Sequence, residues 1–133
     1  MRVDQIQPTC AAMLTEWSEA TGGDNLSLVE WAELRKELLM REAEEACEAI
    51  DIYVETGDAR PLAKELADVQ YVLEGTAQRP MIDLVTAFRL VHASNMSKIG
   101  PDGSYEVRAD GKILKGPHYY EPDMAPAIGG NAV

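Results

Sequence analysis

The sequence predicts an all-α protein: a four-helix antiparallel bundle with a long second helix, followed by a short C-terminal β-hairpin and an irregular tail. Apolar residues recur every three or four positions in four stretches of the first hundred residues, as they do on one face of a helix. The connections between these stretches are short, which favours antiparallel neighbours. A chain of 133 residues also suffices for one domain with its own core.

The first helix is expected from Thr9, after a lead-in of residues 1–8. Its apolar residues share one helix face, and they are Met13, Trp17 and Ala20. Glycine adopts the left-handed conformation readily, so the pair Gly22-Gly23 is expected to end this helix.

The second helix is the longest expected element. Ser27 is a good N-cap, Glu30 completes a capping box with it, and Gly57 would end the helix. A helix of about 29 residues is roughly 43 Å long. That is long for so small a bundle, and the excess length would be covered most simply by a second copy of the chain.

A third helix is expected from Asp58, a capping residue, to about Gln78, with Pro61 tolerated in its first turn. A fourth begins at Pro80 and is broken by Gly100-Pro101. The inward residues expected on the fourth helix are Val85, Phe88, Val91 or His92, and Asn95.

The chain changes character after residue 100. Residues 101–117 are expected to form a hairpin, with YEV and KIL as strands around a turn at Ala109-Asp110-Gly111. The segment from His118 is expected to be irregular, and residues 125–133 disordered. The predicted organisation is thus one domain over residues 1–124 and a disordered tail.

The composition limits the partners of the chain. Its formal net charge is −11, from 23 acidic and 12 basic residues, which disfavours nucleic acids and anionic membranes. A small phosphorylated ligand remains possible if metal ions bridge the two negative partners. Cys10 and Cys47 lack the spacing of metal ligands, and the N-terminus is too polar for a signal peptide. With no apolar run long enough for a membrane span, we expect a cytoplasmic protein.

Two acidic couplets are the strongest functional signal. Glu42 and Glu45 lie in the second expected helix, and Glu65 and Asp68 in the third. Residues three apart are separated by about 60° around a helix, so each couplet points both carboxylates the same way. Both couplets touch apolar stripes, which are Leu34, Leu38, Ala49 and Ile52 in one helix and Leu62, Leu66, Val69 and Leu73 in the other.

Carboxylates that face a core need a counter-charge. Two of them about 4 Å apart repel by roughly 4 kcal/mol at an effective dielectric near 20, so four converging acids would protonate or separate without a cation. Oxygen ligands suit Mg²⁺, with Mn²⁺ as a possible substitute. The alternative is a solvated acidic surface, which best describes Glu37, Glu44, Glu48 and Asp51.

A group of cations follows the helical part. Lys98, Arg108, Lys112 and Lys115 fall within 18 residues, and beside a carboxylate site they indicate a phosphate clamp. Alternatively, Lys98 only complements the helix dipole and the others belong to a charged hairpin. His92, near Asn95 and Lys98 on the fourth helix, fits a packing role better than a catalytic one.

Together these motifs resemble the MazG-like members of the all-α nucleoside triphosphate pyrophosphohydrolases, in the small single-domain branch that includes dUTPase-like enzymes. That superfamily carries Glu-x-x-Glu and, after a gap, Glu-x-x-Asp; here 19 residues separate Glu45 from Glu65. The runs VHASNMSK and RADGKILKGPHYYEPD are similar to the tail of that branch. The resemblance covers about residues 10–123, and it implies assembly as a homodimer or a homotetramer (a dimer of dimers), which agrees with the long second helix.

The resemblance implies an enzyme that hydrolyses a nucleoside triphosphate between its α- and β-phosphates, giving a monophosphate and pyrophosphate. Glu42, Glu45, Glu65 and Asp68 would hold two or three Mg²⁺ ions. Of these, Glu45 is our expected acceptor of the proton from water, with Glu42 beside it. The substrate would be held by the cationic segment, through Asn95, Lys98, Arg108, Lys112 and Lys115.

The chain departs from this family at one position. Close relatives often carry an extra Glu immediately before the first couplet, where this chain has Arg41. A ligand or a water-activating carboxylate is therefore missing or supplied from elsewhere, which leaves the number of metal ions open. Of the nearby acids, Glu48 is a better-placed substitute than Glu44.

An aromatic wall for the base is expected from Trp17, Trp31, Tyr71 and Phe88. Tyr71, three residues after Asp68, would border the site. Trp17 and Phe88 lie on apolar helical stripes, which favours core positions for both. Nothing in the sequence distinguishes one base from another.

Two other functions fit the sequence. One is a phosphoribosyl-ATP pyrophosphohydrolase of the same superfamily, which the segments VHASNMSK and DGK-x-x-KGP disfavour. The other is a catalytically silent acidic bundle that binds a protein partner or senses metal, which Arg41 keeps open.

Overall fold

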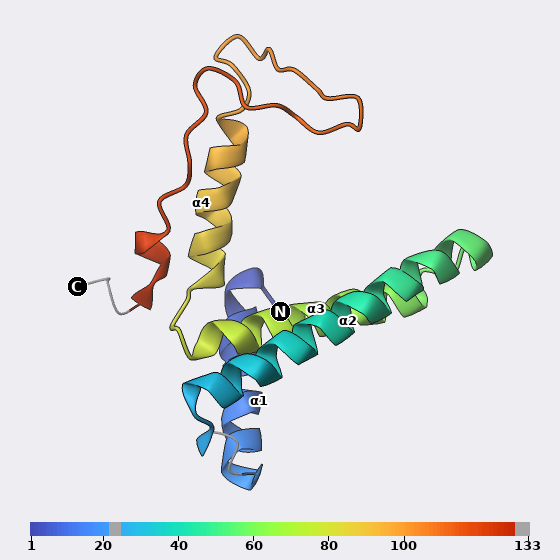
Figure 1. Cartoon of the computed structure of the whole chain (residues 1–133), viewed down its shortest axis with the longest axis vertical. Helices are drawn as coiled ribbons and strands as arrows, with labels where there is room; N and C mark the ends of the chain where they lie inside the picture. Colours follow the sequence, from blue (N-terminus) through green and yellow to red (C-terminus); the bar gives the residue numbers. More distant parts are fainter. Residues whose placement is uncertain (22–24, 130–133) are drawn as a thin grey trace. The chain divides into compact units, whose positions relative to one another are not determined.

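The computed structural model describes residues 1–21 and 25–129 (Figure 1). The chain divides into two compact units, Met1–Pro80 and Met81–Val133, where the sequence leads us to expect one domain over residues 1–124. Among the described residues there are four α-helices and no sheet, which confirms the all-α prediction. The expected hairpin is reduced to an isolated β-bridge between Val107 and Ile113.

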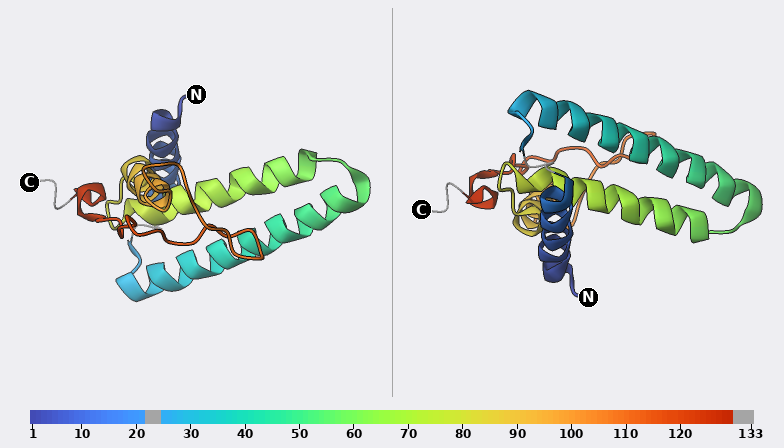
Figure 2. Two further views of the ribbon diagram at one scale, coloured as in Figure 1. Left: turned by 90° about the horizontal axis from the view of Figure 1, so that it is seen from above. Right: turned by 90° about the horizontal axis from the view of Figure 1, so that it is seen from below.

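The first unit is built from three helices. These are α1 (Val3–Thr21), α2 (Leu28–Thr56) and α3 (Arg60–Gln78). α2 and α3 run antiparallel and lie side by side in both views of Figure 2, and α1 packs against α3. The buried apolar residues here are mostly small, namely Cys10, Ala46, Ala49, Val72 and Ala77. Small residues allow the helices to approach closely.

Both ends of α2 are capped as the sequence predicts. Ser27 accepts a hydrogen bond from the Glu30 backbone N–H, and Glu30 accepts one from the Ser27 N–H, which completes the capping box. Gly57 ends the helix in the left-handed conformation, with φ of 71°, and donates to the carbonyl of Tyr53. The helix has the predicted 29 residues.

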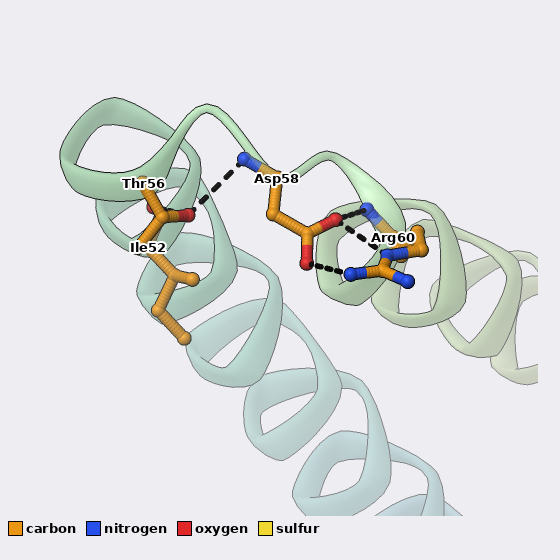
Figure 3. Close-up of polar contacts among 4 residues, drawn as sticks. All are labelled: Ile52, Thr56, Asp58 and Arg60. Carbon is orange, nitrogen blue, oxygen red and sulfur yellow. Dashed lines mark hydrogen bonds and ion pairs between the residues drawn. The ribbon is translucent and has the colours of Figure 1, made fainter.

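The turn between α2 and α3 is held by a short polar chain (Figure 3). The Thr56 hydroxyl donates to the carbonyl of Ile52 and accepts from the N–H of Asp58. The Asp58 carboxylate accepts the backbone N–H of Arg60 at 3.0 Å and also pairs with its guanidinium. Asp58 thus caps α3 from one position before the N-cap, which is Ala59.

Arg35 connects α2 to α3. Its Nε donates to the hydroxyl of Thr76 at 3.2 Å, and its terminal nitrogen donates to the carbonyl of Val72 at 3.2 Å. Gly75 leaves room for this guanidinium, because a Cβ there would lie 2.7 Å from an Arg35 nitrogen. The half-buried position lowers the pKa of Arg35 from its ordinary value. These contacts fix how far α3 is shifted along α2.

Helix α1 differs from its prediction. It begins at Val3 and contains Pro8, so most of the predicted lead-in of residues 1–8 is helical. The inward residues include the buried Cys10, whereas Met13 and Trp17 are 43% and 45% exposed. The face predicted from Met13 and Trp17 is therefore not the buried one. The predicted stop at Gly22-Gly23 lies outside the described residues.

The predicted buried faces of α2 and α3 also differ from the observed ones. Ile52 of α2 and Leu66 and Leu73 of α3 are exposed, although we expected them to face a core. On α3 the buried residues are instead Val72, Glu74, Gly75 and Ala77. A helix with apolar residues on more than one side does not reveal from its sequence which side will pack.

The second unit contains α4 (Leu84–Met96) and the 3-10 helix η2 (Ala125–Ala127), which pack together. Asp83 caps α4 by accepting the N–H of Thr86, so α4 begins later than the predicted Pro80. The buried residue of α4 is Ser94, whose hydroxyl donates to the carbonyl of Tyr120. Phe88 is 72% exposed, so its predicted core position is wrong for this chain.

Part of the predicted disordered tail is ordered. Ala127 is buried and accepts a hydrogen bond from the N–H of Asp83, and Ile82 forms a β-bridge with Ile128. Residues 130–133 lie outside the described part of the chain. The tail therefore contributes to the packing of the second unit through residues 125–129.

The expected hairpin keeps its turn in the second unit. Arg108 donates its N–H to the carbonyl of Lys112, and Gly111 donates to Arg108 with φ of 90°, which favours glycine.

Within the described residues, no helix has both the length and the apolar character needed to cross a bilayer.

Candidate active site

The acidic couplets lie on the antiparallel pair α2 and α3. Three side chains converge: carboxylate oxygens of Glu42, Glu45 and Glu65 all lie within 4.8 Å of one another. All three side chains are half-buried. The helix pairing thus brings both members of the first couplet together with one member of the second. We call these three residues and Asp68 the carboxylate cluster.

Two oxygen atoms of this cluster are left without a partner. Oε2 of Glu42 and Oε2 of Glu65 are buried and have no hydrogen-bond partner. A buried carboxylate oxygen that accepts nothing costs free energy, because its hydration has been removed without replacement. Hard divalent cations such as Mg²⁺ take oxygen ligands. The donor set and its unpartnered oxygens therefore fit such an ion.

The electrostatics of the cluster disfavour its fully charged form. The pKa of Glu42 is raised, first because the carboxyl is partly desolvated and then because of its interactions with Glu45 and the charges of Asp68 and Glu65. Like charges held close together favour uptake of a cation, either a proton or a metal ion.

Asp68 is not among the three converging residues. It pairs instead with Lys64, one turn earlier on α3, at 2.7 Å. The same ammonium lies 3.2 Å from Glu65. Hydrogen bonds to Asp68 and then to Glu65 raise the pKa of Lys64 above its usual range. Part of the negative charge of the cluster is therefore already balanced from within α3.

Arg41 does not pair with the carboxylate cluster. Its guanidinium contacts Glu37 at 2.8 Å, and both side chains are exposed. Glu44 and Glu48, considered above as substitute ligands, are exposed and are not members of the converging group.

The second unit carries a cavity of about 630 Å³ beside the end of α4. Lys98 and Lys115 both line it, together with Tyr105 and His118. Two of its lining segments approach each other closely, since a Cβ on Gly116 would lie 2.7 Å from the carbonyl oxygen of Lys98. Two ammonium groups, a phenol and an imidazole can bind phosphate or sugar oxygens. Asp102 and Glu106, also in the lining, limit how much negative charge the cavity accepts.

The other predicted substrate residues have different surroundings. Asn95 and Lys112 are exposed and are not among the residues that line this cavity. Arg108 pairs with Asp110 across the hairpin turn. Lys115 pairs with Glu121 at 3.2 Å and lies over the ring of Tyr119, and its hydrogen bond lowers the pKa of Glu121.

The aromatic residues expected near a base are spread over both units. In the first unit, Trp17 and Tyr71 are each 45% exposed, so both offer ring surface to a ligand. Trp31 is half-buried, with the Arg79 guanidinium 5.7 Å from its ring centroid. Phe88 belongs to α4 in the second unit.

Sequence reasoning missed three residues of these sites. Lys64 could have been found from its position four residues before Asp68, because oppositely charged residues at that spacing meet on a helix. His118 and Tyr105 gave no such signal, since loop packing alone brings them to the cavity of Lys98 and Lys115.

Comparison with known proteins identifies one family. Residues 24–95 match the sequence model of the family described as phosphoribosyl-ATP pyrophosphohydrolase. The matched segment includes α2, α3 and all four acids of the carboxylate cluster, and it ends at Asn95. None of the curated proteins is similar to the chain in sequence.

Proposed function

The chain belongs to the phosphoribosyl-ATP pyrophosphohydrolase family, and we propose from this premise that it is a metal-dependent enzyme that hydrolyses nucleoside triphosphates between the α- and β-phosphates. That family lies within the MazG-like all-α superfamily that the sequence resembles. The observation that carries the proposal is the convergence of Glu42, Glu45 and Glu65, with buried oxygens that lack partners.

The proposed cofactor is Mg²⁺, two or three ions per site, with Mn²⁺ as a substitute. Glu42, Glu45 and Glu65 would hold it, with Asp68 as the fourth ligand. When bound, the metal neutralises phosphate charge and lowers the pKa of coordinated water. Close relatives often carry an extra acid where this chain has Arg41. Arg41 pairs with Glu37 and cannot serve as a metal ligand.

The chain's own residues then have distinct roles. Glu45, with Glu42 beside it, accepts a proton from the attacking water while the water oxygen forms its bond to phosphorus. The bridging P–O bond breaks, and its electron pair leaves on the departing group, so that monophosphate and pyrophosphate result. A positioned general base contributes roughly 10²- to 10⁴-fold to such a rate.

We also propose that residues of the second unit bind phosphate oxygens. We assign phosphate contacts to Lys98 and Lys115, because both line one cavity, and to Asn95, Arg108 and Lys112 because of their positions in the sequence. Ion pairs to phosphate are among the stronger hydrogen bonds in proteins. Tyr71 and Trp17 offer exposed rings for a base.

Phosphoribosyl-ATP is the second candidate substrate, and the description of the matched family favours it. It carries the same kind of phosphoanhydride, so the carboxylate cluster could serve either substrate. The match ends at residue 95, before the cavity of Lys98 and Lys115. The family match therefore does not extend to the cavity residues, and the substrate panel decides between the two substrates.

A substrate panel tests the proposal. The full chain is incubated with Mg²⁺ and, separately, each dNTP, each NTP and phosphoribosyl-ATP, and pyrophosphate and the second product are identified. We expect pyrophosphate from at least one compound, no release with EDTA, and none from Glu45→Gln. A chain that is folded and binds Mg²⁺ but releases no pyrophosphate from any compound would support the silent bundle instead.

We also propose that the chain works as a homodimer or homotetramer. Large apolar side chains of α2 remain exposed in a single copy, including Val29, Met40, Tyr53 and Val54. A second copy of the chain packed along α2 would remove such side chains from water, which is favourable. Light scattering after size exclusion gives the assembly directly, and a monomer at working concentration would contradict this proposal.

A further inference from the structure

Lys64 is the cation that contacts the carboxylate cluster. It precedes Glu65 directly and lies four residues before Asp68, and its ammonium is 3.2 Å and 2.7 Å from the two carboxylates. The Lys64 side chain is 66% exposed, whereas that of Glu65 is 17% exposed. The ammonium therefore reaches the cluster from the solvent side.

Other cations of the first unit are engaged elsewhere. Arg41 pairs with Glu37, and Arg35 donates to the backbone and side chain of α3. Among the ion pairs of the described residues, only those of Lys64 involve an acid of the cluster. When no metal is bound, Lys64 is therefore the residue that neutralises part of the negative charge of the four carboxylates.

The position of Asp68 agrees with this dependence. It is the one member of the two couplets outside the converging group, and it is also the acid closest to the Lys64 ammonium. An ammonium and a divalent cation held by the same carboxylate repel each other, so each weakens the binding of the other.

We propose that Lys64 is the internal counter-ion of the carboxylate cluster, and that its ammonium competes with a divalent cation for Asp68 and Glu65. This rests on the proposed function, since it assumes that the cluster binds metal. Lys64 is then a residue that sets the metal concentration at which the site fills. It acts through Asp68 and Glu65 and is not itself a catalytic residue.

Competition of this kind gives two effects of opposite sign. Removing the ammonium leaves the carboxylates to repel one another, so the metal-free protein becomes less stable. It also removes a competitor, so the metal binds more tightly. A lysine that only stabilised α3 would not tighten metal binding, and one that helped to hold the ion would weaken it on removal.

The test uses the full chain with Mg²⁺ alone as the probe. Lys64→Met is compared with the unsubstituted chain by isothermal titration and by thermal melting in EDTA. We expect a roughly two- to fivefold lower Kd for Mg²⁺, the range for one exposed competing charge, and a lower Tm in EDTA. Lys64→Arg should retain the original affinity and stability.

Lys36→Met is the matched control. Lys36 is also on a helix, pairs with Glu33 at 2.9 Å and is 65% exposed, but its ion pair involves no acid of the cluster. It should leave the Kd for Mg²⁺ unchanged. If Lys64→Met folds poorly, Lys64→Gln replaces it, because its amide can still accept and donate hydrogen bonds without the charge.

The outcomes separate this inference from the proposed function. If Lys64→Met binds Mg²⁺ with unchanged or weaker affinity, while Glu45→Gln and Asp68→Asn abolish binding, Lys64 is not a competitor and only this inference fails. If the unsubstituted chain binds no Mg²⁺ at these carboxylates, the proposed metal site itself fails.

Discussion

The guanidinium of Arg35 on α2 donates a hydrogen bond to the carbonyl oxygen of Val72 on α3, at 3.2 Å. It is one of the contacts that set the two helices side by side. Since Glu42 and Glu45 lie on one helix and Glu65 on the other, the alignment of these helices determines whether the three carboxylates meet.

Arg35→Met is expected to destabilise the fold. It removes the hydrogen bonds to Val72 and Thr76, and a charged donor lost from a half-buried position costs about 1–2 kcal/mol. Urea denaturation gives the change in the free energy of unfolding. Lys36→Met, which loses only an exposed ion pair, should change it by less than about 0.5 kcal/mol. Equal effects of the two substitutions would show that Arg35 is not a structural contact.

Glu45→Gln and Asp68→Asn should abolish turnover while the helical circular dichroism spectrum remains. Each removes a charge from the proposed metal site, and Glu45 is also the proposed base, so we expect at least a 10²-fold loss of kcat. Pyrophosphate release with Mg²⁺ is the measurement. Glu44→Gln, an exposed change on the same helix, serves as the control and should retain activity. Normal hydrolysis by either cluster variant would falsify the site assignment.

Glu42→Gln should stabilise the metal-free protein at neutral pH. The folded-state pKa of Glu42 is raised, so the folded chain binds a proton there more tightly than the unfolded chain. Glu42 therefore destabilises the fold once the pH exceeds this raised pKa, and the destabilisation disappears below the ordinary glutamate pKa of 4.5. Melting in EDTA from pH 4 to pH 8 measures the effect.

The same variant should respond weakly to metal. Mg²⁺ is expected to raise the Tm of the unsubstituted chain at pH 7.5, because it binds only the folded state. Glu42→Gln, which has lost one proposed ligand, should show a smaller rise. A variant that is less stable than the parent in EDTA at neutral pH would contradict the assigned direction of the pKa shift.

Lys98→Met and Lys115→Met should each raise KM for the nucleotide about tenfold, because each removes one charged hydrogen-bond donor from the cavity. Steady-state kinetics of pyrophosphate release measure this change. The Kd for Mg²⁺ alone should not change, since neither residue belongs to the carboxylate cluster. An unchanged KM in both variants would exclude this cavity from substrate binding.

Gly116→Ala tests the closure of the same cavity. The added Cβ would lie 2.7 Å from the carbonyl oxygen of Lys98, and a backbone atom cannot yield as a flexible side chain does. We expect the segment around Gly116 to move away, with a higher KM and a lower Tm. If neither quantity changes, the close approach is not needed for binding.

Local features of the fold could be predicted from the sequence. The capping box of Ser27 and Glu30 and the left-handed Gly57 fix both ends of α2, because each acts through its nearest neighbours along the chain. The three-residue spacing of Glu42 and Glu45 likewise aligns their carboxylates within one helix. The all-α fold follows from the same periodicity.

Only the tertiary structure decided which helix faces are buried. Trp17, Leu66 and Phe88 fit apolar stripes but are exposed, while Cys10, Val72 and Ser94 are buried. Amphipathic spacing alone cannot rank two apolar faces of one helix, because burial depends on the neighbour that packs there. The pairing of α2 with α3 joins Glu65 to Glu42 and Glu45, and leaves Asp68 with Lys64. The sequence by itself thus determined the helices and the acids they carry, and long-range packing decided which of those acids meet.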